Sequence, residues 1–126
     1  MAGFSTYQAN QTLTDTLVTP YASRYVALFV ADPTDANITA NEVTGVWYSR
    51  MATGAWASPT TGVTSNNNEI QWNAVSGSAV TITHWGIYDA ATSGNLRYSF
   101  AFDTPKTFNV DDIPLISAGD LSITLL

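Results

Sequence analysis

The amino-acid sequence predicts an all-β fold, a single-domain and jelly-roll-like β-sandwich that spans residues 1–126. Three observations lead to this fold class. Apolar and polar residues alternate with a period of two in several short runs, which is the pattern of strands. Clusters of turn-forming residues separate about seven or eight such runs, a spacing typical of sandwiches and jelly rolls. The chain has a mass of 13.5 kDa and 45% hydrophobic residues, which is enough for one core.

Two strands joined by a hairpin loop form the centre of the predicted fold. Leu96–Phe102 alternates apolar with polar or small side chains, and Gly94 and Asn95 before it tolerate the positive φ that a hairpin loop needs. Val80–Tyr88 carries bulk on both faces, so we expect a central strand that is covered on both sides. Strict alternation places two sets of side chains on opposite faces of this strand: Val80, Ile82, His84 and Tyr88, and Thr81, Thr83, Trp85 and Ile87.

Residues 1–19 are expected to form either a short helix or an extended arm. Ser5 and Gln8 have the spacing of a capping box, in which the serine side chain accepts from the N3 amide and the glutamine reaches back. A rough apolar stripe supports the helix: Phe4, Tyr7, Leu13 and Leu17. Interleaved threonines oppose it, because β-branched residues lose side-chain freedom in a helix. Both alternatives stay open at this point.

The other expected strands are shorter. Residues 25–30 form a continuous apolar run, which is typical of a strand buried on both faces. A turn at residues 32–35 follows, because Asp caps a turn and Pro presets φ. We expect further strands at residues 46–51, 70–73, 107–110 and 121–125, and a turn at residues 103–106.

Residues 54–68 are expected to form a long variable loop or a poor edge strand, and long loops are often binding elements. Trp56 lies in this weakly patterned stretch and is the best candidate for an exposed contact, because exposed aromatic residues anchor interfaces. The other tryptophans are more typical of a sandwich core, although a sugar-stacking platform is the alternative. The remaining candidates for contacts with a partner are Asn66, Asn67, Asn68 and Tyr7.

The charge balance argues against several classes of partner. The net charge is −6, and charged residues make up only 11% of the chain. The cations are few and scattered: Arg24, Arg50, Arg97 and Lys106. They cannot form a basic patch, so we expect no binding to nucleic acid or to an anionic membrane surface. A surface covered mainly by uncharged polar residues favours a protein that is partly buried in an assembly.

Cysteine is absent, which excludes disulfides, thiolate metal sites and cysteine nucleophiles. Residues 1–6 lack the basic and apolar regions of a signal peptide. The longest apolar run, residues 25–31, is far shorter than a membrane-spanning segment. We therefore expect synthesis in a cytoplasm without export through a cleaved signal.

Enzymatic chemistry has little support in the residues. His84 is the only histidine, and Asp89 or Asp103 could orient it as a base, but no G-x-S-x-G elbow supplies a nucleophile. We therefore expect His84 to be a packed, hydrogen-bonded side chain of the fold. The clustered acidic residues lack the ligand alternation of a calcium loop and are expected to serve turns. We therefore expect no enzyme, no cofactor and no metal.

Several stretches of the chain resemble a family of small virion structural proteins of tailed phages. They are Met1–Tyr7, Tyr25–Asp35, Glu42–Val43 with Tyr48–Arg50, Thr83–Leu96, Thr104–Thr107 and Ala118–Asp120, followed by the closing alternating strand. Members of this family are commonly labelled tail fibre, minor structural or head-decoration proteins. The resemblance covers nearly the whole chain in order and departs at residues 8–19 and 51–68. It implies a non-enzymatic virion part and supplies no catalytic, metal or cofactor residues.

The resemblance and the composition together suggest a capsid decoration (cement) protein on the outer surface of the phage head, because a small acidic protein stays soluble and avoids packaged DNA. The alternative is a tail-fibre or baseplate-associated module that contacts the host surface, with a glycan as a possible ligand. The expected partners are further copies of the chain, as a trimer or larger homo-oligomer, and other virion proteins such as major capsid or tail proteins. Synthesis is expected in the bacterial host cytoplasm. A small cell-wall hydrolase is disfavoured by the lone histidine.

Overall fold

The structure is a computed structural model that describes residues 3–19 and 23–126. Eight strands and one α-helix are present in the described ranges. In chain order they are α1 (Thr6–Leu13), β1 (Tyr25–Phe29), β2 (Met51–Ala52), β3 (Val63–Ser65), β4 (Ile70–Gln71), β5 (Val80–Tyr88), β6 (Leu96–Phe108), β7 (Leu115–Ile116) and β8 (Ser122–Thr124). A π-helical turn (Thr14–Val18) follows α1, and a 3₁₀ turn (Thr39–Asn41) precedes β2.

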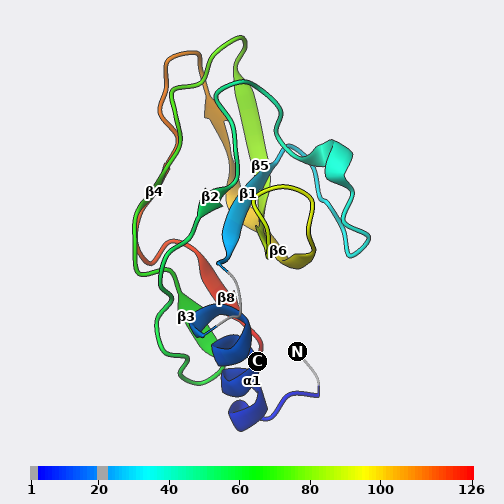
Figure 1. The fold of residues 1–126 in the computed structure, drawn as a ribbon, viewed down its shortest axis with the longest axis vertical. Coiled ribbons are helices and arrows are strands. Elements are labelled where there is room, and N and C mark those ends of the chain that lie inside the picture. The colour runs from blue at the N-terminus through cyan, green and yellow to red at the C-terminus, as the bar shows by residue number, and fades with distance from the viewer. Residues whose placement is uncertain (1–2, 20–22) are drawn as a thin grey trace.

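The predicted hairpin of β5 and β6 forms one side of the largest sheet, with β5 inside it and β6 at its edge. Four strands form this sheet in the order β2-β1-β5-β6, and all of its pairs are antiparallel. β5 lies between β1 and β6, as its bulk on both faces predicted. β1 is almost completely buried, which confirms the predicted strand for residues 25–29, whereas Val30 lies beyond it and is 43% exposed. Figure 1 shows β5 and β1 side by side in the upper half of the molecule.

Irregular pairing between β5 and β6 overturns two sequence predictions. Ile82 pairs with Lys106 and His84 with Ala101, so β6 carries extra residues between these pairs and forms a bulge. Residues 103–106 therefore belong to β6, and the expected separate turn is wrong. On β5 the alternation is interrupted as well, because Ile82 and Trp85 both reach the main core. The prediction that Ile82 and Trp85 lie on opposite faces of β5 is therefore wrong, because the irregular pairing interrupts the alternation of side chains between them.

Two small sheets complete the fold around the main core. β3 pairs with β8, and β4 pairs with β7, both antiparallel. Side chains from all three sheets and from α1 meet in one cluster, which includes Leu13, Leu28, Trp56, Trp72, Ile82, Ile116 and Ile123. The all-β class with a short helix is thereby confirmed. The jelly-roll arrangement stays a prediction, because the described strands form one four-stranded sheet and two two-stranded sheets.

The N-terminal segment forms the predicted helix over residues 6–13. Ser5 is the N-cap, and its hydroxyl accepts from the Gln8 amide at 3.1 Å. The Gln8 side chain donates forward to Thr12 at 3.0 Å, so only half of the capping box forms. Beyond α1, the Thr14 and Thr16 hydroxyls donate to carbonyls four residues earlier, and the helix continues as a π turn. In Figure 1, α1 lies at the lower end beside β3 and β8.

The predicted strand at residues 46–51 is wrong for most of its length. Gly45 has a φ of +149°, and residues 45–47 turn instead of extending, so that Val46 is 96% exposed. The Trp47 indole folds back beneath this glycine, where a Cβ would lie 2.8 Å from its ring nitrogen. Only Met51 and Ala52 join a sheet, as β2. A close approach between a glycine and a tryptophan thus outweighs the β-forming composition of this stretch.

Residues 54–68 contain paired backbone segments and do not form one long irregular loop. β3 lies within this stretch, and isolated bridges join Trp56 to Asn66 and Thr60 to Val63. The segment therefore folds back on itself as a tight hairpin, closer to the poor edge strand that the sequence left as the alternative. α1 covers it, because the Asn10 side chain accepts from the Gly62 amide at 2.7 Å.

Candidate interaction surfaces

Trp56 does not form the exposed contact that the sequence suggested. Its side chain is only 3% exposed, and its indole N–H donates to the Thr53 hydroxyl at 3.0 Å. Thr53 is itself 1% exposed. The expectation of exposure is therefore wrong, because the hairpin of residues 54–68 turns its one tryptophan inward to fill the core. All tryptophans of the chain are in fact buried, at 5% exposure or less.

Asn66 is buried as well, at 1% exposure, and serves as a structural bridge. Its side-chain amide donates to the Asn68 carbonyl at 2.8 Å and to the Ser117 carbonyl at 3.2 Å. Its side-chain carbonyl accepts from the Leu121 amide at 2.9 Å. This residue thus joins the end of β3 to the turn before β8, and its expected availability to a partner is wrong. Three consecutive asparagines gave no sequence signal to separate the buried one from its neighbours.

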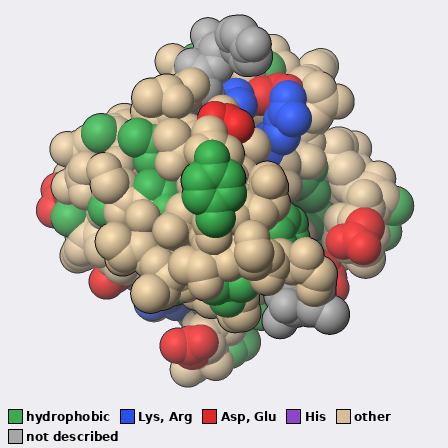
Figure 2. Space-filling view, turned by 90° about the horizontal axis from the view of Figure 1, so that it is seen from below, with side chains coloured by type: hydrophobic (Ala, Val, Ile, Leu, Met, Phe, Trp, Pro, Cys, Tyr) green, Lys and Arg blue, Asp and Glu red, His purple; other side chains and the backbone are tan. Residues whose placement is uncertain are grey.

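Tyr7, Asn67 and Asn68 are exposed, as the contact hypothesis requires. Tyr7 is 76% exposed, on the side of α1 away from the buried Ala9 and Leu13. Asn67 and Asn68 are both exposed at the end of β3. Figure 2 views the molecule from below and shows a face made mainly of backbone and side chains that are neither hydrophobic nor charged, with hydrophobic and charged groups scattered over it. Contacts of these three residues with a partner stay a prediction.

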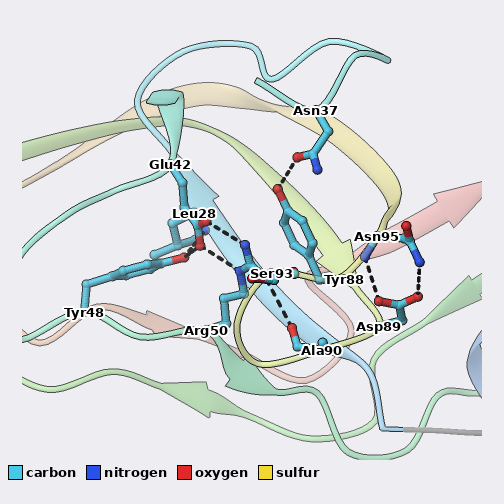
Figure 3. Close-up of polar contacts among 10 residues, drawn as sticks. All are labelled: Leu28, Asn37, Glu42, Tyr48, Arg50, Tyr88, Asp89, Ala90, Ser93 and Asn95. Carbon is cyan, nitrogen blue, oxygen red and sulfur yellow. Dashed lines mark hydrogen bonds and ion pairs between the residues drawn. The ribbon is translucent and has the colours of Figure 1, made fainter. Parts of the chain in front are cut away.

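A polar network around Arg50 is the most elaborate cluster of side chains in the described structure (Figure 3). The guanidinium binds Glu42 with two bonds, from Nη2 to Oε1 at 2.9 Å and from Nε to Oε2 at 3.0 Å. Its Nη1 donates to the carbonyls of Ala90 at 3.2 Å and Ser93 at 2.6 Å. The guanidinium carbon lies 3.5 Å from the centroid of the Tyr88 ring. One cation thus joins the loop before β2, the end of β5 and the hairpin loop before β6.

Two tyrosines extend this network. The Tyr48 hydroxyl donates to Glu42 at 2.6 Å and accepts from the Leu28 amide at 3.1 Å. Burial raises the pKa of Tyr48, and its hydrogen bond to the Glu42 carboxylate raises it further. Tyr88 donates through its hydroxyl to the Asn37 side chain. Every buried side-chain nitrogen and oxygen atom in this cluster has a hydrogen-bond partner. A fully satisfied network of this kind holds the loops that it joins in fixed positions.

The sequence carried only a partial signal for this network. Glu42, Tyr48 and Arg50 lie in the stretches that resemble the phage family, but nothing in their spacing shows that they meet. The turn at residues 45–47, which the sequence did not predict, brings them together.

Asp89 organises the hairpin loop between β5 and β6. Its carboxylate accepts from the Asn95 amide at 2.7 Å, from the Asn95 side chain at 3.0 Å and from Arg97 at 3.0 Å. The bonds from Asn95 are the main cause that lowers the pKa of Asp89 from 3.8 to about 2, and the Arg97 bond adds to them. Asp89 is therefore committed to its own loop and does not orient His84.

His84 lies in a shallow depression on the outer face of the large sheet. Its Nδ1 is 2.8 Å from the Thr83 hydroxyl. Asp32, Asp35 and Phe100 help to line the same depression of about 510 Å³. Asp103, the other predicted orienting residue, lies in a different hollow. Within residues 3–19 and 23–126, no three side chains of the metal-ligating types come together.

An open groove follows the outer edge of β6, with a volume of about 500 Å³. β6 contributes one wall, from Phe100 to Lys106, and residues of β7 and β8 contribute the other. Leu115 of β7 is 44% exposed, and Ile113 before it is 52% exposed. We call this hollow the β6 groove.

A comparison with protein-family models matches residues 3–124 to the family described as podophage GP4 fiber I protein gp80. The chain belongs to this family. The match covers all the strands and α1 and takes in the Arg50 network, the β6 groove and the exposed Tyr7. A search of the curated proteins gives no match.

Membership of the gp80 fibre family confirms the resemblance to tailed-phage structural proteins. The chain is accordingly a structural component of a phage particle and is located in the virion, in association with other virion components. Among the described residues, no helix is long and apolar enough to cross a membrane.

Proposed function

We propose that this protein is a module of a phage tail fibre, which reverses the order of preference that the sequence suggested for the two positions in the particle. The match of the fibre family to residues 3–124 carries this proposal, because it extends over almost the whole chain. Residues 1–126 contain neither sequence repeats nor a heptad shaft, so this module does not itself form the shaft of a fibre.

The module works through shape and rigid presentation of its loops. The Arg50 network anchors the loops that leave β1 and β5, and Asp89 closes the hairpin loop between β5 and β6. Such fixed loops reduce the entropy that is lost when a partner binds. The uncharged polar surface suits burial against other subunits, in a homo-oligomer that we propose to be a trimer or larger.

Head decoration is the second candidate, and one observation favours it. The chain is small and carries a net charge of −6, which suits an outer position on a capsid filled with DNA. A decoration protein has one copy or more at every lattice point, whereas a fibre module has few copies per particle. Copy number therefore separates the two candidates.

The decisive experiment compares electron cryomicroscopy maps of particles with and without this protein. We expect density to disappear from the tail while the head stays unchanged. Quantitative mass spectrometry of the same particles should give a small copy number relative to the major capsid protein. Loss of density at regular positions on the head surface, together with a high copy number, would establish decoration in place of the fibre role.

Contact with the host surface is the finer part of the fibre proposal. Tyr7, Asn67 and Asn68 are the exposed candidates for such contacts. We expect the variants Tyr7→Ala and Asn67→Ala to reduce binding of the purified protein to host cells while the unfolding midpoint stays unchanged. Cells that bind neither the variants nor the natural protein would argue that the module faces only other virion chains.

A further inference from the structure

We propose that the outer edge of β6 binds an extended segment of another virion protein, a segment in which apolar residues alternate with lysine or arginine. The added segment would pair with the backbone of β6 and lay its apolar side chains into the β6 groove. This inference names a partner surface within the particle and goes beyond the proposed fibre position, since a head protein could use the same edge.

The backbone of β6 supplies the first argument. β6 is the longest strand, with 13 residues, and it is the last strand of its sheet. β5 is its only partner in the described structure, so its outer row of N–H and C=O groups has no strand beside it. An exposed strand edge of this length is a template for another strand, and proteins usually cover or interrupt such an edge.

The interruptions in β6 leave one regular part of the strand between them. Near its start the register with β5 shifts at Arg97, between the residues that pair with Ile87 and Tyr88. Pro105 lacks an N–H, and the bulge lies between the residues that pair with His84 and Ile82. From Tyr98 to Ala101 the pairing with β5 is regular. An added strand therefore has a regular edge along this part and ends where Pro105 removes a donor.

The β6 groove supplies the second argument, because it lies directly beside this edge. Trp85 and Ile116 form part of its lining, and both belong to the main core. Phe100 and Phe102 of β6 are only half-buried there. An alternating segment would cover these surfaces with every second side chain, as β-strand addition does in peptide recognition.

Charge identifies the kind of segment. Asp103 and Asp120 are exposed carboxylates that line the groove, against a single ammonium group from Lys106. The chain as a whole carries −6. A second copy is equally acidic, and of its cations Arg97 is already bound to Asp89 while Arg50 is buried in its ion pair. Electrostatic complementarity therefore favours a basic segment from a different chain.

The first test uses two short synthetic peptides and the purified protein. One peptide alternates valine with lysine, and the other alternates valine with glutamate. Amide chemical shifts recorded by NMR should move along Tyr98–Asp103 on addition of the lysine peptide. The glutamate peptide should bind about tenfold more weakly. Equal binding of both peptides, or shifts confined to another part of the chain, would overturn the proposal.

Two controls separate strand addition from simple charge attraction. A lysine peptide with alternate backbone nitrogens methylated has the same charge but cannot donate along one edge, and it should not bind. The double variant Asp103→Asn with Asp120→Asn should lose most of the difference between the lysine and glutamate peptides while its unfolding midpoint stays the same. Unchanged selectivity in this variant would contradict the charge argument.

The second test works in the assembled particle. A photo-crosslinking residue at Thr104, which lines the groove, should join this chain to an extended basic and apolar segment of a different virion protein. The same group at Thr92, which is exposed on the hairpin loop, is the control and should not capture that segment. Capture of only a second copy at Thr104 would overturn the inference. Capture of such a segment in a head protein would overturn the fibre position and leave the inference standing.

Discussion

Arg50 is one of the few charged residues of the chain, and its charge joins several loops inside the fold. Its side chain is 7% exposed and that of Glu42 is 13% exposed, so this pair is largely shielded from water. The pair of Arg97 and Asp89 has the same chemistry, but the Arg97 side chain is 43% exposed. Buried and exposed ion pairs respond very differently to loss of one partner, because only the buried one leaves an uncompensated charge.

Replacing Arg50 by alanine should destabilise the protein by about 3–5 kcal/mol, because Glu42 would remain buried without a cation. Urea unfolding followed by tryptophan fluorescence measures this loss. Arg97→Ala is the matched control and should cost less than about 1 kcal/mol. The double variant Arg50→Met with Glu42→Gln should recover part of the stability, since it leaves no unpaired charge. Equal losses for Arg50→Ala and Arg97→Ala would refute the structural role of the network.

The lowered pKa of Asp89 predicts that part of the free energy of unfolding is lost at low pH. Its pKa is about 2 in the folded chain, below the ordinary 3.8. A group with a lowered folded pKa stabilises the fold fully above its unfolded pKa and loses this contribution as the pH falls towards its folded pKa. The loss from Asp89 should thus occur as the pH falls from about 4 to about 2.

NMR titration of the Asp89 carboxyl carbon should give a midpoint near the lowered value. Over the same interval, the unfolding midpoint of Asp89→Asn should fall less steeply with acid than that of the natural protein. Parallel curves for the two proteins would show that the hydrogen bonds of this loop do not stabilise the charged carboxylate.

At the scale of elements, the stretch of residues 54–68 looked least structured in the sequence and contains a core tryptophan. Its small and polar residues permit a tight hairpin, and the bulky Trp56 then has only the interior of that hairpin to occupy. Exposure of an aromatic side chain therefore could not be inferred from the polar character of its neighbours. The backbone pairing, which is a long-range property, decides its direction.

Trp56→Ala should destabilise the protein by about 3–5 kcal/mol, because it opens a cavity in the main core. Thermal unfolding measures the effect. Asn67→Ala, an exposed change in the same hairpin, should alter stability by no more than about 0.5 kcal/mol. A small effect of Trp56→Ala together with lost binding to a partner would restore the original hypothesis of an exposed contact.

At the scale of the whole molecule, a small number of charged residues must keep a protein rich in β-strands in solution. Charged residues make up 11% of the chain, and the isoelectric point is about 4.2. The large sheet ends in the exposed edge of β6, which favours association once repulsion between molecules disappears. Net negative charge at neutral pH therefore keeps the free protein dispersed before it is assembled.

We expect solubility to pass through a minimum near pH 4.2, which light scattering across a pH series would reveal. Added salt at pH 7 should increase association, because it screens the repulsion between acidic molecules. Solubility that is insensitive to both pH and salt would show that net charge does not control association.

The amino-acid sequence alone predicts the all-β class, the hairpin of β5 and β6, the helix cap at Ser5 and the membership of a phage structural family. Those features depend on periodicity, on residues close together in the chain and on ordered motifs, which are all visible in one dimension. Other features emerge only in the folded chain: the burial of Trp56 and Asn66, the bulge of β6 and the ion pair of Glu42 with Arg50. Each of these depends on which distant segments pair and in what register, and local patterns leave that register open because many pairings satisfy the same alternation.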